Sequence, residues 1–126
     1  KQGRIYVAHT VNSSATSSDA VCVYDKDGRF LTSWGSEFKG GAHGLDIRSE
    51  HGQEFLYHCD TGRRKVSKTD LNGKVIWELG VPEASGKYKN GEPYIPTNLA
   101  FSPDGGFYVA DGYGSNWIHQ YDHKAN

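Results

Sequence analysis

VCVYDKDGRFLTSWG at residues 21–35 and VSKTDLNGKVIWELG at residues 66–80 are imperfect copies of one pattern, and this repetition is the main evidence for the fold class. The two copies begin 45 residues apart and keep the same order of apolar and turn residues. In each copy, two short apolar runs flank an Asp-Gly or Asn-Gly pair, which is a strong signal for a β-hairpin. We therefore expect two equivalent hairpins of antiparallel strands.

A second pattern recurs three times along the chain, as RIYVAH (4–9), FLYHCD (55–60) and GFYVAD (106–111). Its copies lie 51 residues apart, and their third positions are Tyr6, Tyr57 and Tyr108. A third pattern appears twice, as HGLDI (43–47) and TNLAF (97–101). Patterns that repeat in a fixed order indicate a chain built from similar structural units.

The order of the patterns predicts an all-β fold with three groups of strands, in residues 4–35, 43–80 and 96–122. Units of about 45 to 50 residues with four short strands are typical of β-propeller blades. We therefore predict that residues 1–126 form a partial β-propeller, about two and a half blades of a six-bladed ring. The remaining blades would come from a longer parent chain or from other copies. The alternative is a ten-strand sandwich, which does not explain the fixed order of the repeats.

The composition argues against two classes of partner. With 14 Lys and Arg against 15 Asp and Glu, the net charge of −1 gives no field that would hold a nucleic acid. No stretch approaches the roughly 20 consecutive apolar residues of a membrane span. The two cysteines, Cys22 and Cys59, permit at most one disulfide, and we expect buried free thiols.

The predicted connections between strands differ in length at the two ends of the sheets. Tight turns are expected near Gly28, Gly52, Gly73 and Gly105. The long connections all fall at the other end, in residues 10–19, 36–42, 60–64, 81–96 and 111–116. Long loops on a rigid scaffold commonly carry binding groups, so we expect the functional site at this loop-rich end. The segment 81–96 is predicted to be a lid or rim over it.

Two stretches at this end resemble a known family. GAHGLDI (41–47), followed by IPTNLAFSPDGGFYVADGYGSNWIHQYD (95–122), is similar to NHL-repeat propellers and, among them, to the peptidyl-α-hydroxyglycine α-amidating lyases. The resemblance covers nearly the whole chain. It implies that His43 is a zinc ligand and that Tyr113 is the catalytic tyrosine. The other two zinc-binding histidines and a catalytic arginine would lie in blades after residue 126.

The resemblance also implies a small or peptide-like ligand, with zinc as cofactor. A structural calcium ion and a secreted or periplasmic location are further expectations. His9 belongs to the predicted substrate site, but the family has His-Arg where this chain has His9-Thr10. Arg63 or Arg64, at the same end, is therefore expected to supply the missing cation. A purely structural interpretation of His9, in which it caps the end of its strand, stays open.

Other interpretations of the same residues also stay open. Asp60 and Asp111 are expected to bind backbone N–H groups of their loops, as Asx turns do. Tyr113 lies between two glycines, which allow the backbone to take positive φ angles and place the ring freely, and its ring can serve packing instead of catalysis. The whole chain can also be a non-enzymatic propeller that recognises a protein or a glycan, or a unit that associates with its own copies.

Overall fold

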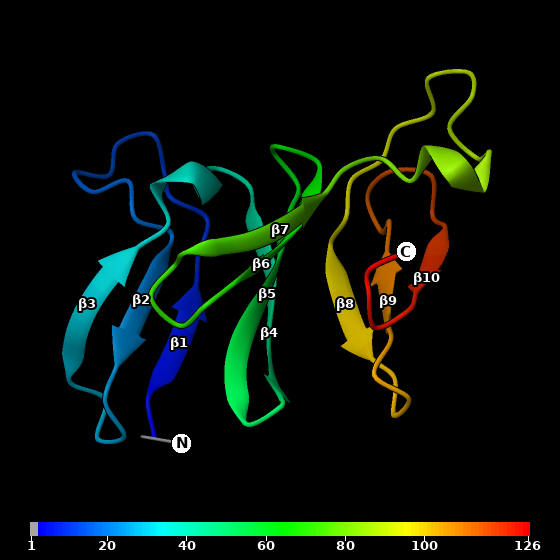
Figure 1. The fold of residues 1–126 in the computed structure, drawn as a ribbon. Coiled ribbons are helices and arrows are strands. Elements are labelled where there is room, and N and C mark those ends of the chain that lie inside the picture. Colours follow the sequence, from blue (N-terminus) through cyan, green and yellow to red (C-terminus); the bar gives the residue numbers. More distant parts are fainter. Residues whose placement is uncertain (1–2) are drawn as a thin grey trace.

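The computed structural model describes residues 3–126 and is all-β, with three antiparallel sheets side by side (Figure 1). The first sheet contains β1 (Ile5–Ala8), β2 (Val21–Tyr24) and β3 (Phe30–Trp34). The second contains β4 (Ala42–Glu50), β5 (Gln53–Asp60), β6 (Lys65–Thr69) and β7 (Val75–Leu79). The third, in the order β10-β9-β8, contains β8 (Asn98–Phe101), β9 (Phe107–Ala110) and β10 (Ile118–Tyr121). Two short 3₁₀ helices, η1 (Ser36–Phe38) and η2 (Glu83–Ser85), lie in the connections.

The strands and their grouping agree with the sequence prediction. The sheets contain three, four and three strands in chain order, and neighbouring strands pair antiparallel. A β-sandwich has two packed sheets, so the ten-strand sandwich is wrong. The tight turns are also confirmed, because Gly28, Gly52, Gly73 and Gly105 all have positive φ angles between 81° and 94°.

The long connections gather at one end of the sheets. In Figure 1 the segments that follow β1, β3, β5, β7 and β9 run along the upper side, whereas the turns after β2, β4 and β8 lie at the lower side. The inner strands of the second and third sheets, β4 and β8, are neighbours, and β1 lies on the other side of β4. The start of β4 and the loop after β9 therefore reach the same loop-rich end.

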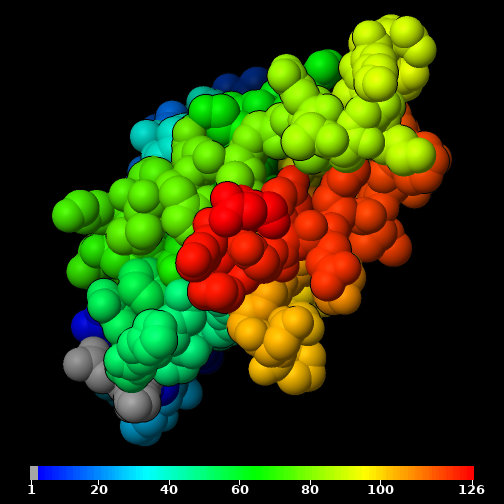
Figure 2. Space-filling view, turned by 45° about the vertical axis from the view of Figure 1, so that its right-hand side comes forward, coloured from blue at the N-terminus to red at the C-terminus, as the bar shows by residue number. Residues whose placement is uncertain are grey.

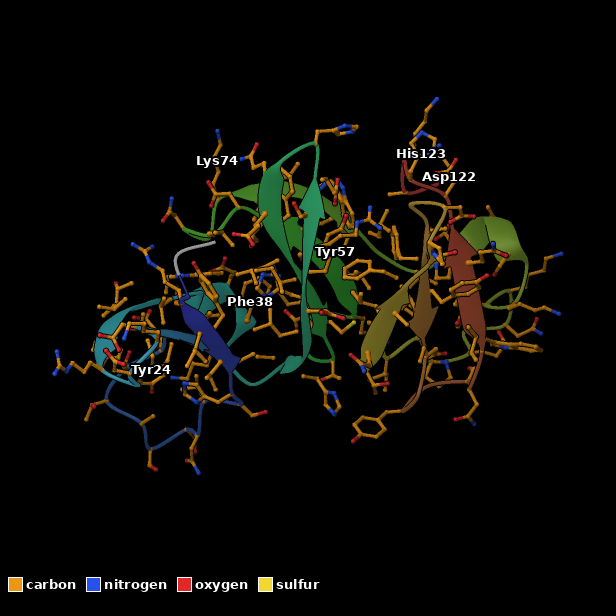
Figure 3. All side chains as sticks on the ribbon, turned by 90° about the horizontal axis from the view of Figure 1, so that it is seen from below. Tyr24, Phe38, Tyr57, Lys74, Asp122 and His123 are labelled. Carbon is orange, nitrogen blue, oxygen red and sulfur yellow. The ribbon has the colours of Figure 1, made fainter. Side chains whose placement is uncertain are left out.

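The second sheet is buried on both faces because it lies between the other two. Tyr57 and Cys59 of β5 pack with Phe107 in a cluster between the second and third sheets. The intervening residue His58 points the opposite way, where its ring stacks on Phe38 at 4.5 Å. Figure 3 shows Tyr57 and Phe38 on these two sides of the second sheet. Contacts between sheets thus come from alternate residues of each strand.

His58 is a buried histidine in the contact between the first and second sheets. Its Nε2 lies 2.9 Å from Thr69 Oγ1, and its ring also meets Trp34 edge to face at 5.7 Å. Burial lowers the pKa of His58 from 6.5 to about 4; the nearby Arg63 guanidinium lowers it too, whereas Asp60 opposes the shift. The folded chain therefore holds a neutral imidazole at this interface.

We expect the chain to lose stability as the pH falls from about 6.5 to about 4, the unfolded and folded pKa values of His58. In this window the unfolded state binds a proton that the folded state does not, so the free energy of unfolding decreases by up to about 3 kcal/mol. Urea unfolding at pH 7 and pH 4.5 measures this loss. Between these two pH values, the free energy of unfolding of His58→Gln should decrease less than that of the wild type. The control His51→Gln, at an exposed turn, should show the same decrease as the wild type. Equal losses in all three proteins would contradict this role of His58.

Two further sequence expectations can be compared with the fold. Cys22 and Cys59 are both free thiols, as expected, although Cys22 is only half-buried. The described part of the chain has no helix of the length and apolar character needed to cross a bilayer.

Candidate functional site

His43 stands in a β-bulge at the loop-rich start of β4. Ala42 pairs with Asp60 and Gly44 pairs with Cys59, so His43 is the extra residue between two successive pairs. A bulge re-aims the side chain that it carries, and bulges are frequent beside active sites. The His43 side chain is consequently exposed at the rim, although it lies within a strand.

The glycine after His43 is required by the close approach of two inner strands. A Cβ atom at Gly44 would lie 2.6 Å from the carbonyl oxygen of Thr97 and 2.9 Å from Cα of Asn98, so no other residue fits without moving β8. The same approach brings His43 Nδ1 to 2.7 Å from the Thr97 oxygen. The His-Gly pair therefore aims and anchors an imidazole against the neighbouring sheet.

The anchoring bond determines which nitrogen of His43 is available. A carbonyl oxygen only accepts hydrogen bonds, so Nδ1 carries the proton and donates it to Thr97. In the neutral ring, Nε2 keeps its lone pair and accepts the hydroxyl of Tyr113 at 3.1 Å. The two rings meet edge to face, with centroids 5.0 Å apart. Residues 70 positions apart in the sequence thus form one exposed acid–base pair.

Tyr113, the second member of this pair, has 65% of its surface exposed. The flanking glycines do not use the positive φ angles that glycine allows, because neither Gly112 nor Gly114 has a positive φ. Their lack of a side chain serves close packing: a Cβ atom at Gly112 would overlap Thr97, and one at Gly114 would overlap Asp111 and Pro93. The glycines therefore fit the Tyr113 loop tightly onto the third sheet.

Asp111 holds this loop from beneath, in the structural role expected for it. Its buried carboxylate accepts the backbone N–H groups of Ile95 at 2.6 Å and Ser115 at 2.8 Å. It also accepts the hydroxyl of Tyr88 at 3.0 Å, and the Tyr88 oxygen lies 2.7 Å from His119 Nε2. Because the single hydroxyl proton of Tyr88 is donated to Asp111, the Tyr88 oxygen accepts a hydrogen bond from His119 Nε2.

The Asp111 contacts attach the segment 81–96 to the third sheet. Tyr94 in this segment is fully buried, and Pro93 accepts a hydrogen bond from the Ser115 hydroxyl at 2.9 Å. Figure 2 shows the segment in yellow-green above the orange-red part of the third sheet. The segment forms part of the rim beside the loop that carries Tyr113.

His9 reaches the same end from the first sheet but has a different environment. Its backbone N–H donates to Ala20, and its Nε2 lies 3.7 Å from the Cys22 sulfur. The following residue, Thr10, donates its hydroxyl to the carbonyl of Ala42 at 3.1 Å. The chain therefore passes directly beside the residue that precedes His43, and Thr10 here joins two sheets.

The two arginines of the 60–64 connection differ in their surroundings. Arg63 Nε lies 2.6 Å from the buried carboxylate of Asp60, Nη1 lies 3.1 Å from Glu78, and the guanidinium covers the ring of Phe38. These contacts give Arg63 a structural position between loop and outer strand. Both arginines are exposed, but Arg64, which has a left-handed φ of 58°, forms no such ion pair among the described residues, so it is the freer of the two.

The surroundings of His43 can be compared with those of a histidine that binds zinc. Zinc-binding histidines usually donate their other ring N–H to a carbonyl or carboxylate, as His43 Nδ1 does to Thr97, and the Nε2 lone pair, which here accepts the Tyr113 hydroxyl, is the one that a metal would use. Residues 3–126 contain no cluster of three or more His, Cys, Asp or Glu side chains able to hold a metal. His43 therefore fits as one ligand, and further ligands would have to come from outside this set.

A cleft of about 570 Å³ lies at the opposite, tight-turn end, between residues near Arg48 and Asp104. Two of its charged groups are already paired, since Glu50 binds Arg48 at 3.2 Å and Lys68 at 2.7 Å. The candidate site is therefore placed at the rim with His43 and Tyr113, where an imidazole nitrogen meets a hydroxyl.

Some residues of the site escaped sequence reasoning. Thr97 acts through its backbone oxygen, which carries no residue-specific signal. Tyr88 and His119 meet only because the 81–96 segment folds back on β10. The alternation of β10 could have shown that His119 faces inward.

No family model matches this chain, and no curated protein matches it in sequence.

Proposed function

We propose that this chain is part of an NHL-type β-propeller related to the peptide α-amidating lyases. In this proposal the loop-rich end binds zinc through His43 and presents Tyr113 to a small or peptide-like ligand. The observation that carries it is the 3.1 Å contact between His43 Nε2 and the Tyr113 hydroxyl. Zinc on Nε2 would take the lone pair that accepts this hydroxyl and would leave the tyrosine beside the metal. Both residues of the contact come from the motifs on which the resemblance rests.

The stacking of the sheets supports the propeller arrangement. Neighbouring sheets contact face to face, β4 and β8 lie side by side, and the long connections share one end. These features are those of successive blades around an axis.

The proposed reaction breaks the carbon–nitrogen bond of a peptide that ends in α-hydroxyglycine. Tyr113, as the phenolate, takes the proton of the substrate hydroxyl, the carbon–nitrogen bond breaks as the carbonyl of glyoxylate forms, and the nitrogen takes up this proton to give the peptide amide. Zinc, when bound, polarises the substrate hydroxyl as a Lewis acid. Thr97 keeps the His43 ring oriented, and Arg64 is the exposed cation available to a carboxylate.

We expect His43→Ala to lower the zinc content of the purified full-length protein at least tenfold, because the variant loses a directly coordinating nitrogen. Elemental analysis by mass spectrometry gives the zinc content per chain. His123→Ala is the matched control, since His123 lies at the tight-turn end beside Gly105. A wild-type zinc content in His43→Ala would remove His43 from the metal site.

A non-enzymatic binding propeller is the second candidate. It is favoured by the exposed aromatic side chains of Tyr113 and Trp117 at the rim, where Lys87 lies 4.4 Å from the Trp117 ring. Aromatic side chains are enriched at surfaces that bind proteins. This candidate would be supported if the protein bound its ligand without turnover and if Tyr113→Phe left the affinity unchanged.

A further inference from the structure

We propose that Asn12, in the long connection between β1 and β2, is an acceptor site for an N-linked glycan. The site goes beyond the proposed function, since it uses neither His43 nor Tyr113. Its evidence is a sequence motif together with the local structure and the exposure of the loop that carries it.

The motif is Asn12-Ser13-Ser14, which fits the pattern Asn-X-Ser/Thr with X other than proline. Four other asparagines lack a hydroxyl at the third position: Asn72, Asn90, Asn98 and Asn116 are followed there by Lys, Glu, Ala and Ile. A motif of three residues also arises by chance, so the surroundings of Asn12 in the structure carry the argument.

The first structural observation is the direct contact between the two residues that the motif requires. The Asn12 side-chain oxygen Oδ1 accepts the Ser14 hydroxyl at 3.0 Å and the Ser14 backbone N–H at 2.9 Å, which closes an Asx turn. The Ser13 hydroxyl approaches the same oxygen at 3.4 Å. All of these bonds use Oδ1, and within residues 3–126 the Asn12 amide nitrogen Nδ2 has no hydrogen-bond partner. The atom that bonds to a glycan is therefore free.

The second observation is that the loop is anchored at its ends and open along its length. Val11 and Ala20, at the two ends, are buried in the cluster that contains Phe38. Every residue from 12 to 18 is exposed, and none belongs to a helix or strand. In Figure 1 this connection extends in dark blue from the upper end of the first sheet. An N-linked glycan is bulky and needs a surface position of this kind.

The loop also leaves room around Asn12. Residues 13–18 are Ser, Ala and Thr only, so the loop itself has no long or charged side chain beside the amide. The Ala15 backbone N–H donates to the Asn12 carbonyl at 3.0 Å, so the turn is closed without the side-chain nitrogen. A sugar on Nδ2 would displace no hydrogen bond of the described chain.

The modification forms a bond between Asn12 Nδ2 and the anomeric carbon of an oligosaccharide that is carried on a lipid diphosphate. The bond from that carbon to the diphosphate oxygen breaks, the diphosphate leaves with the electron pair, and the amide nitrogen loses one proton. Donor and transferase belong to the secretory compartment of eukaryotic cells, so the proposal requires that the chain enters it. A secreted location is one of the two expected from the sequence.

The full-length protein, expressed with its own N-terminal sequence in a eukaryotic cell line, tests the site. Peptide N-glycosidase in heavy-oxygen water converts a glycosylated asparagine to an aspartate that carries the heavy oxygen, and peptide mass spectrometry locates the label. We expect the label at Asn12 in most molecules. A digest without the glycosidase gives the background from spontaneous deamidation.

Two serine variants provide a matched comparison within the same loop. Ser14→Ala should lower the labelled fraction at least about tenfold, because the motif requires this hydroxyl. Ser13→Ala should keep the wild-type fraction, since the motif leaves the middle position free, and Ser14→Thr should keep it too. Both serines are exposed, so neither substitution removes a packed side chain.

An unlabelled Asn12 in the wild type would overturn the proposal. The same holds if the label appears only after a foreign secretory leader is attached, because the chain would then not reach the transferase by itself. Equal labelling of Ser13→Ala and Ser14→Ala would exclude the motif as the cause. The zinc content of His43→Ala is independent of these results, so this proposal and the proposed function can fail separately.

Discussion

Tyr113→Phe is expected to lower the turnover of a peptide ending in α-hydroxyglycine by about 10²- to 10⁴-fold, the usual contribution of a positioned acid or base. The substitution removes only the hydroxyl that lies 3.1 Å from His43 Nε2 and keeps the exposed ring. Release of glyoxylate by the full-length protein measures the rate, and calorimetry measures peptide binding. Binding should change little, since the ring remains.

Tyr24→Phe is the control for loss of a tyrosine hydroxyl. Tyr24 lies in the first sheet, opposite Ile5 and remote in the sheet order from the Tyr113 loop, and its substitution should leave turnover unchanged. Wild-type turnover in Tyr113→Phe would exclude the tyrosine as the proton acceptor. Absence of turnover in the wild type, together with peptide binding, would favour the non-enzymatic candidate.

Asp111→Ala is expected to lower the free energy of unfolding by about 3 to 5 kcal/mol, because buried donors lose a charged acceptor. The carboxylate accepts three hydrogen bonds, from Ile95, Ser115 and Tyr88. Burial and this carboxylate raise the pKa of Tyr88, so the tyrosine stays a proton donor whose partner would be missing. Urea unfolding followed by tryptophan fluorescence measures the loss.

Asp104→Ala separates the role of Asp111 from that of loop aspartates in general. Asp104 accepts the backbone N–H of Gly106 in a tight turn of the same sheet, and its carboxylate is exposed. Its removal should shift the unfolding midpoint much less than removal of Asp111. Similar shifts in both variants would mean that Asp111 does not fasten the 81–96 segment.

Much of the fold could be predicted because local signals recur. The Asp-Gly and Asn-Gly pairs mark the turns at Gly28 and Gly73, and both have the positive φ that such turns need. Alternation of apolar residues then identifies the strands, and the repeat gives their grouping. The bulge at His43 was not predictable, since it follows from a shift of pairing between two strands that the sequence does not reveal.

The candidate site was predictable only in part. The lengths of the connections predicted that His43 and Tyr113 lie at the same end of the sheets. Their contact, however, depends on how closely β4 approaches β8 at Gly44. Arg63 illustrates the opposite case. Its residue type fitted a substrate-binding cation, yet Asp60 and Glu78 already neutralise it, and such pairing depends on three-dimensional proximity.

The position of the second sheet has a consequence for how the molecule unfolds. Strands β5 and β6 carry side chains that pack against both flanking sheets. Separation of these strands would therefore expose to water both the cluster around Tyr57 and Phe107 and the contact between His58 and Phe38. Local fluctuations should therefore begin at β3 and β10, and amide hydrogens of β5 and β6 should exchange with deuterium last, only through global unfolding.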